Sequence, residues 1–208
     1  MNLKTLASKL KELQTIDEPV IITLYTLSGR SLFILLLLAA LTTIALYPVL
    51  HTSILIWVII LGGLTGYRLY SANIFKKNPK KYSMEIWYKK FMVNATITAL
   101  IFSTLGFIFI HQVDYYYQLY ILAVLLGLSS GSTVSLSPDI RLNTVYAAIL
   151  LLPLSITLLF LYDTPLHLIL AVSIILYFIA QVTTIYKMSM QKNEFNNLQS
   201  EHMFLHSL

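Results

Sequence analysis

The residues best suited to chemistry in this chain are histidines and aspartates in or next to the short connections between its apolar segments. They are His51, His111, Asp114, Asp163 and His167. Imidazole and carboxylate groups that converge could bind a metal ion or change charge between about pH 5 and 8. Histidine is also amphipathic and favours a membrane interface by itself. We therefore treat these five residues as a candidate outer-face sensing group and expect no metal site.

A second group is a run of hydroxyl side chains in the fourth apolar segment. Its members are Ser129, Ser130, Ser132, Thr133 and Ser135. Such hydroxyls could line a path for a neutral solute, or they could let two helices approach and hydrogen-bond to each other. The residue types favour packing, and both interpretations stay open at this stage.

Catalysis by this chain is not expected. The sequence has no G-x-S-x-G, H-E-x-x-H, P-loop or G-x-G-x-x-G motif. It has no cysteine, which excludes thiol catalysis, Cys-ligated zinc and iron–sulfur clusters. Intramembrane catalysis and ion-coupled transport usually need nucleophiles or charged groups inside the membrane, and the interiors of the apolar segments carry no charged residue. We expect no catalytic residue and no cofactor.

The composition places these residues in a membrane protein. The 208 residues are 57% hydrophobic and 11% charged, and the mean hydropathy is +0.75. A soluble domain carries about 25% charged residues, so too little polar surface is left to cover a water-soluble particle. The composition excludes an ordinary cytosolic enzyme, a disordered chain and a disulfide-stapled secreted domain.

Six apolar segments approach the length of about 20 residues that a helix needs to cross a bilayer. They are Ser31–Val49, Ile54–Tyr70, Phe91–Ile110, Gln118–Leu136, Val145–Leu161 and His167–Tyr186. Their hydrophobicity does not alternate as it does in transmembrane strands. The predicted fold class is all-α, a polytopic membrane protein with six transmembrane helices in three hairpins. Arg68 is the one charged residue in these segments, and we expect it to snorkel to the surface from the end of the second.

The basic residues predict an orientation. All 14 Lys and Arg lie before the first segment, around the second connection, in the fourth connection or after the sixth segment. Lys and Arg in short loops mark the cytoplasmic side, so both termini are expected there. Aromatic residues near the segment ends predict interfacial belts, with Tyr67, Tyr70, Trp87, Tyr88 and Tyr186 at the inner edge.

Two polar stretches flank the predicted transmembrane domain, 19–186. Residues 1–18 place leucines at helical spacing and predict an amphipathic cytoplasmic helix that packs on anionic lipid or on the bundle itself. Pro19 ends this helix. Residues 187–208 predict a cytoplasmic exit helix, and no Gly or Pro terminates it before Leu208. We therefore expect further chain after Leu208.

Small residues and a proline predict where the helices pack. Two glycine clusters contain G-x-x-x-G spacings, formed by Gly62 with Gly66 and by Gly127 with Gly131. Two glycines one turn apart let helices approach closely, either within one bundle or between two protomers. Pro153 lies inside the fifth segment and predicts a kink there.

Several short motifs follow one another through residues 50–200. They are Tyr67-Arg68-Leu69, the basic loop through Pro79, Trp87-Tyr88-Lys89-Lys90-Phe91, Gly106, Gly127–Gly131, Leu151-Leu152-Pro153-Leu154, Asp163-Thr164-Pro165-Leu166-His167-Leu168 and Asn193-Glu194-Phe195. In this order the chain resembles the six-span N-terminal sensor modules of bacterial diguanylate cyclases (GGDEF and EAL proteins) and sensor histidine kinases. The chain itself contains no GGDEF, EAL or kinase motif.

The resemblance implies a sensory and anchoring module of the bacterial inner membrane. Such a module passes a stimulus through its last helix to a C-terminal output domain, a diguanylate cyclase of cyclic di-GMP signalling or a histidine kinase. The implied partners are the lipid bilayer, a second copy in a homodimer and the output domain in cis, with no nucleic acid. The resemblance also implies a role for Asp163 and His167, which otherwise fit a turn that caps the sixth helix. The alternatives are a channel or facilitator for small neutral solutes and a membrane scaffold.

Overall fold

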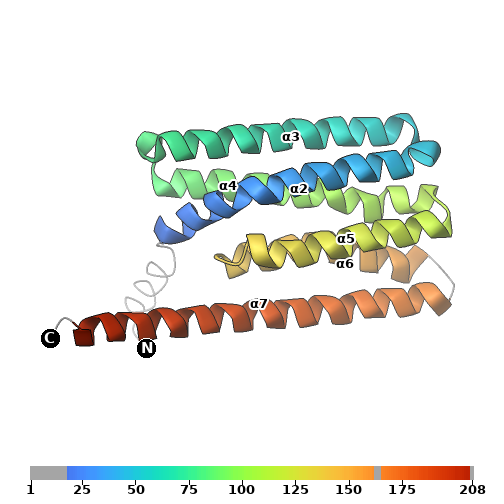
Figure 1. The fold of residues 1–208 in the computed structure, drawn as a ribbon. Helices are drawn as coiled ribbons and strands as arrows, with labels where there is room; N and C mark the ends of the chain where they lie inside the picture. Colours follow the sequence, from blue (N-terminus) through green and yellow to red (C-terminus); the bar gives the residue numbers. More distant parts are fainter. Residues whose placement is uncertain (1–17, 162–164, 207–208) are drawn as a thin grey trace, which may run out of the picture.

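The chain folds into long α-helices that lie side by side (Figure 1). The structure, a computed structural model, describes the backbone over residues 18–161 and 165–206 and the side chains over 18–160 and 165–188. The elements are α2 (Glu18–Leu50), α3 (Thr52–Lys77), η1 (Pro79–Lys81), α4 (Met84–Phe107), η2 (Phe109–Gln112), α5 (Tyr115–Ser135), α6 (Ile140–Leu161) and α7 (Pro165–His206). The two short elements, η1 and η2, are 3₁₀ helices.

The described residues include six helices that are long and apolar enough to cross a membrane. Each overlaps one of the six predicted segments, which confirms the all-α fold class and the prediction of six helices fit to span a bilayer. The third segment differs in detail, because the α-helix ends at Phe107 and the segment finishes in the 3₁₀ helix η2. The predicted amphipathic helix lies outside the described residues, apart from Glu18, where α2 begins.

The connections between helices are short and locally stabilised. His51 alone separates α2 from α3, and its φ of 43° lies in the left-handed region that non-glycine residues rarely adopt. Its N–H donates to the Tyr47 carbonyl at 3.0 Å, which extends the hydrogen bonding of α2 into the turn. At the start of α6, the carboxylate of Asp139 accepts the Leu142 N–H at 3.0 Å and caps the helix.

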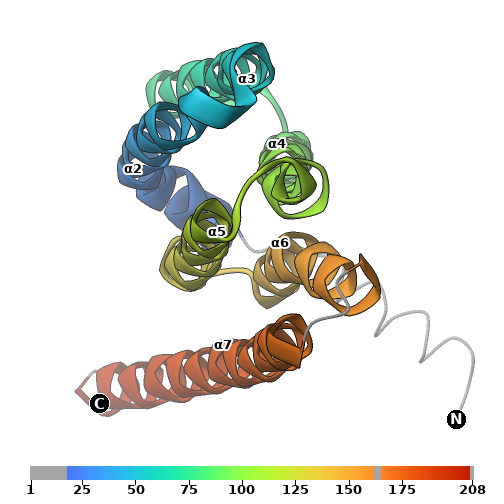
Figure 2. The ribbon, with the colours of Figure 1, turned by 90° about the vertical axis from the view of Figure 1, so that its right-hand side faces the viewer.

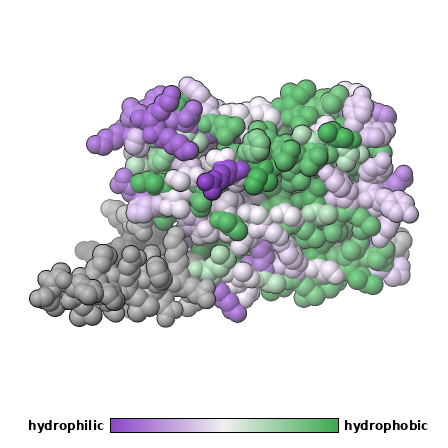
Figure 3. All heavy atoms as spheres, in the orientation of Figure 1, coloured by the Kyte–Doolittle hydropathy of each residue, from purple (hydrophilic) through white to green (hydrophobic). Residues whose placement is uncertain are grey.

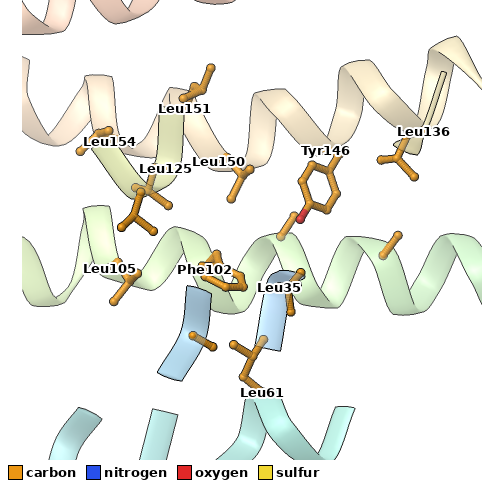
Figure 4. Close-up of a cluster of buried hydrophobic side chains, with 14 of the residues drawn as sticks. Leu35, Leu61, Phe102, Leu105, Leu125, Leu136, Tyr146, Leu150, Leu151 and Leu154 are labelled. Carbon is orange, nitrogen blue, oxygen red and sulfur yellow. The ribbon is translucent and has the colours of Figure 1, made fainter. Parts of the chain in front are cut away.

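The helices form three layers when seen end-on. In Figure 2, α2 and α3 lie on one side, α4, α5 and α6 lie in the middle, and α7 lies on the far side against α6. Leu150 and Leu154 of α6 face Phe102 and Leu105 of α4 in the buried core (Figure 4). The close approach requires Gly106, where an added Cβ would lie 2.9 Å from Leu125 Cδ1 and 3.1 Å from Leu154 Cβ.

The outer surface of the bundle is apolar over most of its length. Phe33, Ile44, Ile59 and Phe160 are 70–80% exposed, and Figure 3 shows a broad hydrophobic area with hydrophilic side chains gathered at one end. An exposed apolar surface of this extent is typical of contact with lipid. Figure 1 places the α3–α4 connection, the α5–α6 connection and the first residues of α2 at the same end, which we call the lysine-bearing end.

The prediction that Trp87 belongs to an interfacial belt is wrong. Its side chain is 1% exposed, whereas Tyr70 and Tyr186 are 64% and 58% exposed. The Trp87 indole N–H donates to the Pro79 carbonyl at 2.9 Å, and its ring packs edge-on against Tyr25. Trp87 thus finds a polar partner inside the protein and does not need the membrane interface to supply one.

Candidate functional site

A cavity of about 160 Å³ lies among α2, α4, α5 and α6, with Arg68 of α3 reaching into it. A single water molecule needs about one tenth of that volume. The wall is mostly apolar, and it includes a small set of polar side chains. These are Ser28, Ser31, Arg68, Ser132, Ser135 and Tyr146.

The guanidinium of Arg68 points into the bundle. Its Nη1 donates to Thr98 Oγ1 of α4 at 2.9 Å, and its Cζ lies 5.9 Å from the centre of the Phe91 ring. The predicted snorkelling of Arg68 to the surface is therefore wrong. The reason is its position on α3, because Thr65 and Ser71, one turn before and one turn after, are both buried and face the neighbouring helices.

The charge of Arg68 has no carboxylate partner among the described side chains. None of the acidic residues in that part of the chain lines the cavity. Glu85 pairs with Lys89 at 2.6 Å, and Asp139 accepts the Tyr88 hydroxyl at 2.6 Å. A guanidinium carries five N–H donors, and in a low-dielectric site it attracts an anion far more strongly than it does in water.

The cavity opens between α2 and α5. Ile34 on the α2 side is 64% exposed, and Gly127 and Gly131 on the α5 side are exposed as well. The inner wall is buried and includes Phe91 of α4 and Tyr146 of α6. Figure 4 shows the Tyr146 ring projecting from α6 toward α4. The opening therefore lies on the apolar outer surface, where lipid chains would be.

The hydroxyl run of α5 is used mainly in contacts between helices. Ser129 Oγ donates to Gln181 Oε1 of α7 at 2.7 Å, and Gln181 Nε2 donates to Thr133 Oγ1 at 3.0 Å. Ser130 is hydrogen-bonded to the Tyr177 hydroxyl of α7. Ser132 links α5 to α6, because its one hydroxyl proton is shared between the Ser129 carbonyl at 2.6 Å and Asn143 Oδ1 of α6 at 3.1 Å. These contacts support the packing interpretation of the hydroxyls.

The four glycines of the G-x-x-x-G spacings do not seal contacts within the described bundle. A Cβ added at Gly62, Gly66, Gly127 or Gly131 would meet no heavy atom within 4 Å apart from its own helix and neighbours. Gly127 and Gly131 instead border the cavity. Contact between protomers through these glycines stays a prediction. The helix α6 continues past Pro153 to Leu161.

The predicted outer-face group is spread over separate connections. His51 is exposed in the α2–α3 turn, His111 is exposed in η2 and Asp114 precedes α5. His167, near the start of α7, lines a small cavity of about 10 Å³. Asp163 lies outside the described residues. In the described part of the chain, no three His, Asp or Glu side chains come close enough to hold a metal ion, and a sensing role stays a prediction.

Sequence reasoning missed three polar residues that organise the site. Thr98 holds Arg68, Gln181 joins α7 to α5, and Asn143 joins α6 to α5. A signal for Gln181 exists in the sequence, because it is the polar amide inside an otherwise apolar segment. An amide in a bilayer has a strong tendency to find a hydrogen-bond partner on another helix.

Comparison of the chain with protein-family models, with curated proteins and with solved structures gives no match. The resemblance to six-span sensor modules accordingly depends on the sequence motifs alone.

Proposed function

We propose that this chain is a sensory and anchoring module of the bacterial inner membrane. In this proposal, its last helix carries a change in helix packing to an output domain that follows Leu208. The observation that carries the proposal is the junction of α5 with α7. Gln181 of α7 hydrogen-bonds to Ser129 on the same short stretch of α5 whose glycines border the Arg68 cavity.

The two faces of α5 suit a connecting role. Gly127 and Gly131 border the cavity, and Ser129 and Thr133 contact Gln181. Ser129 comes two residues after Gly127, and Thr133 comes two residues after Gly131. Two residues correspond to a rotation of about 200° around the axis of an α-helix. The cavity and α7 therefore contact opposite sides of one helix. A ligand that moves α5 would also move α7, provided that the bundle has two packing states.

The length of α7 supports an output role. It runs without a break for 42 residues from Pro165 to His206. At 1.5 Å per residue this is about 63 Å, roughly twice the thickness of the bilayer core. Such a helix can cross the membrane and extend well beyond it, as the helix of a sensor must to reach an output domain.

The proposed topology has three hairpins with both termini in the cytoplasm. Support comes from the lysine-bearing end, where Lys76 and Lys77 end α3 and Lys80 and Lys81 lie in the α3–α4 connection. Short loops rich in lysine mark the cytoplasmic side of a membrane protein. A homodimer is part of the proposal, and the open faces of Gly62 and Gly66 suit contact with a second protomer.

The neutral-solute facilitator has less support. A facilitator lined by the hydroxyls of α5 would need them to face a passage. Instead, Ser129, Ser130 and Thr133 hydrogen-bond to α7, and Ser132 hydrogen-bonds to α6.

The proposal that an output domain follows in the same chain is tested by sequencing the source gene past the Leu208 codon. We expect an open frame that runs into a diguanylate cyclase, EAL phosphodiesterase or histidine kinase domain. A stop codon directly after Leu208 would overturn the output domain in cis. The scaffold and facilitator interpretations would then take precedence.

The coupling from the cavity to α7 is tested by a distance measurement. The chain has no cysteine, so Glu85→Cys on α4 and Lys187→Cys on α7 give two unique sites for spin labels. We expect the distance distribution between the labels to shift or broaden when Gly131→Leu fills the cavity, and also in Gln181→Leu. Thr184→Val, on the exposed side of α7, is the matched control. A distribution that both test variants leave unchanged would refute the coupling.

A further inference from the structure

The cavity around Arg68 combines a cation with an apolar wall. The guanidinium donates to Thr98 at 2.9 Å, and no described carboxylate lines the cavity to neutralise its charge. A charged group inside a membrane protein is energetically expensive unless it has a partner, and such groups mark binding sites or functional pathways. The natural complement of this arginine is an anion that comes from outside the chain.

The polar and apolar parts of the cavity are separated along the bundle. On α2, Ser28 and Ser31 lie nearer the lysine-bearing end, while Leu35 and Leu38 lie one to three turns deeper. The wall on α5 has the same order, because Ser132 and Ser135 lie nearer that end than Gly127 and Leu128. A lipid in the adjacent leaflet has the same order, with its polar head at the surface and its chain in the interior.

The opening of the cavity faces the membrane. Its edges are the exposed Ile34 of α2 and the exposed Gly127 and Gly131 of α5. Neither glycine has a side chain that could close the gap between the two helices, and a Cβ at either one would meet open space. A molecule in the bilayer can therefore reach Arg68 by moving sideways between α2 and α5.

We propose that this cavity binds an anionic amphiphile, a phosphate or carboxylate head on an acyl chain, which enters from the bilayer with its head at Arg68. The serine hydroxyls at the polar end donate to carbonyls of their own helices, and a bound head group would require them to turn toward it. The volume of about 160 Å³ suits a head group or the first part of a chain, since an engineered cavity of about 150 Å³ in another protein holds benzene. The remainder of the chain would lie along the surface between α2 and α5.

This inference goes beyond the proposed function, because a lipid can bind whether or not an output domain is attached. It is tested on the full chain in detergent micelles, titrated with phosphatidylglycerol or with phosphatidylcholine, with bound lipids counted by native mass spectrometry. We expect the first phosphatidylglycerol to bind at least about tenfold more tightly than the first phosphatidylcholine. Both lipids carry a phosphate, but the trimethylammonium group of phosphatidylcholine cancels its net charge and would be repelled by Arg68.

Two variants probe different parts of the site. Arg68→Gln should weaken the first phosphatidylglycerol about ten- to a hundredfold and weaken phosphatidylcholine much less, because the net charge of phosphatidylcholine is zero. Gly131→Leu should weaken both lipids by filling the opening, and it leaves the Arg68–Thr98 contact in place, so it remains informative if Arg68→Gln does not fold. The matched controls are Arg141→Gln, an exposed arginine outside the cavity, and Gly63→Leu, an exposed glycine on α3.

Three results would overturn the proposal. The first is equal affinity for the two lipids. The second is equal weakening by Arg68→Gln and Arg141→Gln, which would show attraction to the surface charge alone. The third is displacement of phosphatidylglycerol by inorganic phosphate at comparable concentration, which would make the ligand a free anion from water. None of these results bears on the gene sequence after Leu208, so failure of the lipid site and failure of the proposed output domain are distinguishable.

Discussion

Gln181 of α7 and Ser129 of α5 are joined by two hydrogen bonds through both ends of the glutamine amide. Ser129 Oγ donates to Gln181 Oε1 at 2.7 Å, and Gln181 Nε2 donates to the Ser129 carbonyl at 2.6 Å. Both residues are buried, with Ser129 fully so. This pair fixes the register of the last helix against the bundle at the level of the cavity.

Gln181→Leu should loosen α7 from α5. Interhelical hydrogen bonds in membranes contribute about 0.6 kcal/mol on average and up to about 1.7 kcal/mol. Since the amide bonds to Ser129 and Thr133, we expect the free energy of unfolding in detergent to fall by about 1–2 kcal/mol. Thr184→Val on the same helix removes only a hydroxyl bonded to its own backbone and should have little effect. Equal losses in the two variants would show that the α5–α7 pair adds no stability.

Replacing Gly106 by alanine should lower the free energy of unfolding, whereas replacing Gly131 by alanine should not. A Cβ at Gly106 would lie 2.9 Å from Leu125 Cδ1 and 3.1 Å from Leu154 Cβ. Gly106→Ala should therefore force α4 and α6 apart and lower the free energy of unfolding by about 1–3 kcal/mol. Gly131→Ala meets open space and should be neutral or stabilising by up to about 1 kcal/mol, because alanine is the better helix former. Thermal unfolding of the two variants measures the contrast, and a larger loss in Gly131→Ala contradicts the packing described here.

Asp139 links the start of α6 to α4. Its Oδ1 accepts the Leu142 N–H at 3.0 Å and its Oδ2 accepts the Tyr88 hydroxyl at 2.6 Å. Asp139→Ala should lower the free energy of unfolding by about 1–3 kcal/mol through loss of the cap and of a hydrogen bond to a charged group. Tyr88→Phe removes the hydroxyl alone and should lower it by about 1 kcal/mol.

A double-mutant cycle separates the two roles of Asp139. In the Asp139→Ala background, Tyr88→Phe should have almost no further effect, because the hydroxyl has already lost its acceptor. Chemical unfolding of the four proteins measures this coupling. Strictly additive losses would mean that the Tyr88–Asp139 contact does not contribute to stability.

Both tryptophans should be shielded from lipid. Trp57 and Trp87 are 4% and 1% exposed, and their indole N–H groups donate to the carbonyls of Ile101 and Pro79 at 2.9 Å. We expect lipids with brominated acyl chains to quench the intrinsic tryptophan fluorescence only weakly. Tyr70→Trp places an indole at a position that is 64% exposed and should add a strongly quenched component. Strong quenching of the unmodified chain would place its tryptophans at the lipid surface instead.

The amino-acid sequence by itself determined the number of helices and where each crosses the apolar part of the chain. The start of α2 is an exception, because the helix begins at Glu18 and not at Ser31. Length and apolarity are properties of a continuous segment, and a bilayer requires each crossing segment to satisfy its own backbone hydrogen bonds as a helix. Six such segments separated by polar connections therefore predict six helices before any contact is known. The confirmed overlap of the predicted segments with α2 to α7 follows from this local rule.

Only the tertiary structure decided which side of each helix faces inward. Helices that span a membrane are apolar on both their lipid-facing and buried sides, so the pattern that marks the inner face of a soluble helix is weak. The sequence accordingly predicted Arg68 and Trp87 at the surface, whereas the structure buries Trp87 and turns the Arg68 guanidinium toward Thr98. It also made Gly106, and not the G-x-x-x-G glycines, the site of close helix contact within the described bundle. These outcomes depend on the shapes and hydrogen-bond partners that distant helices offer one another, which no single segment specifies.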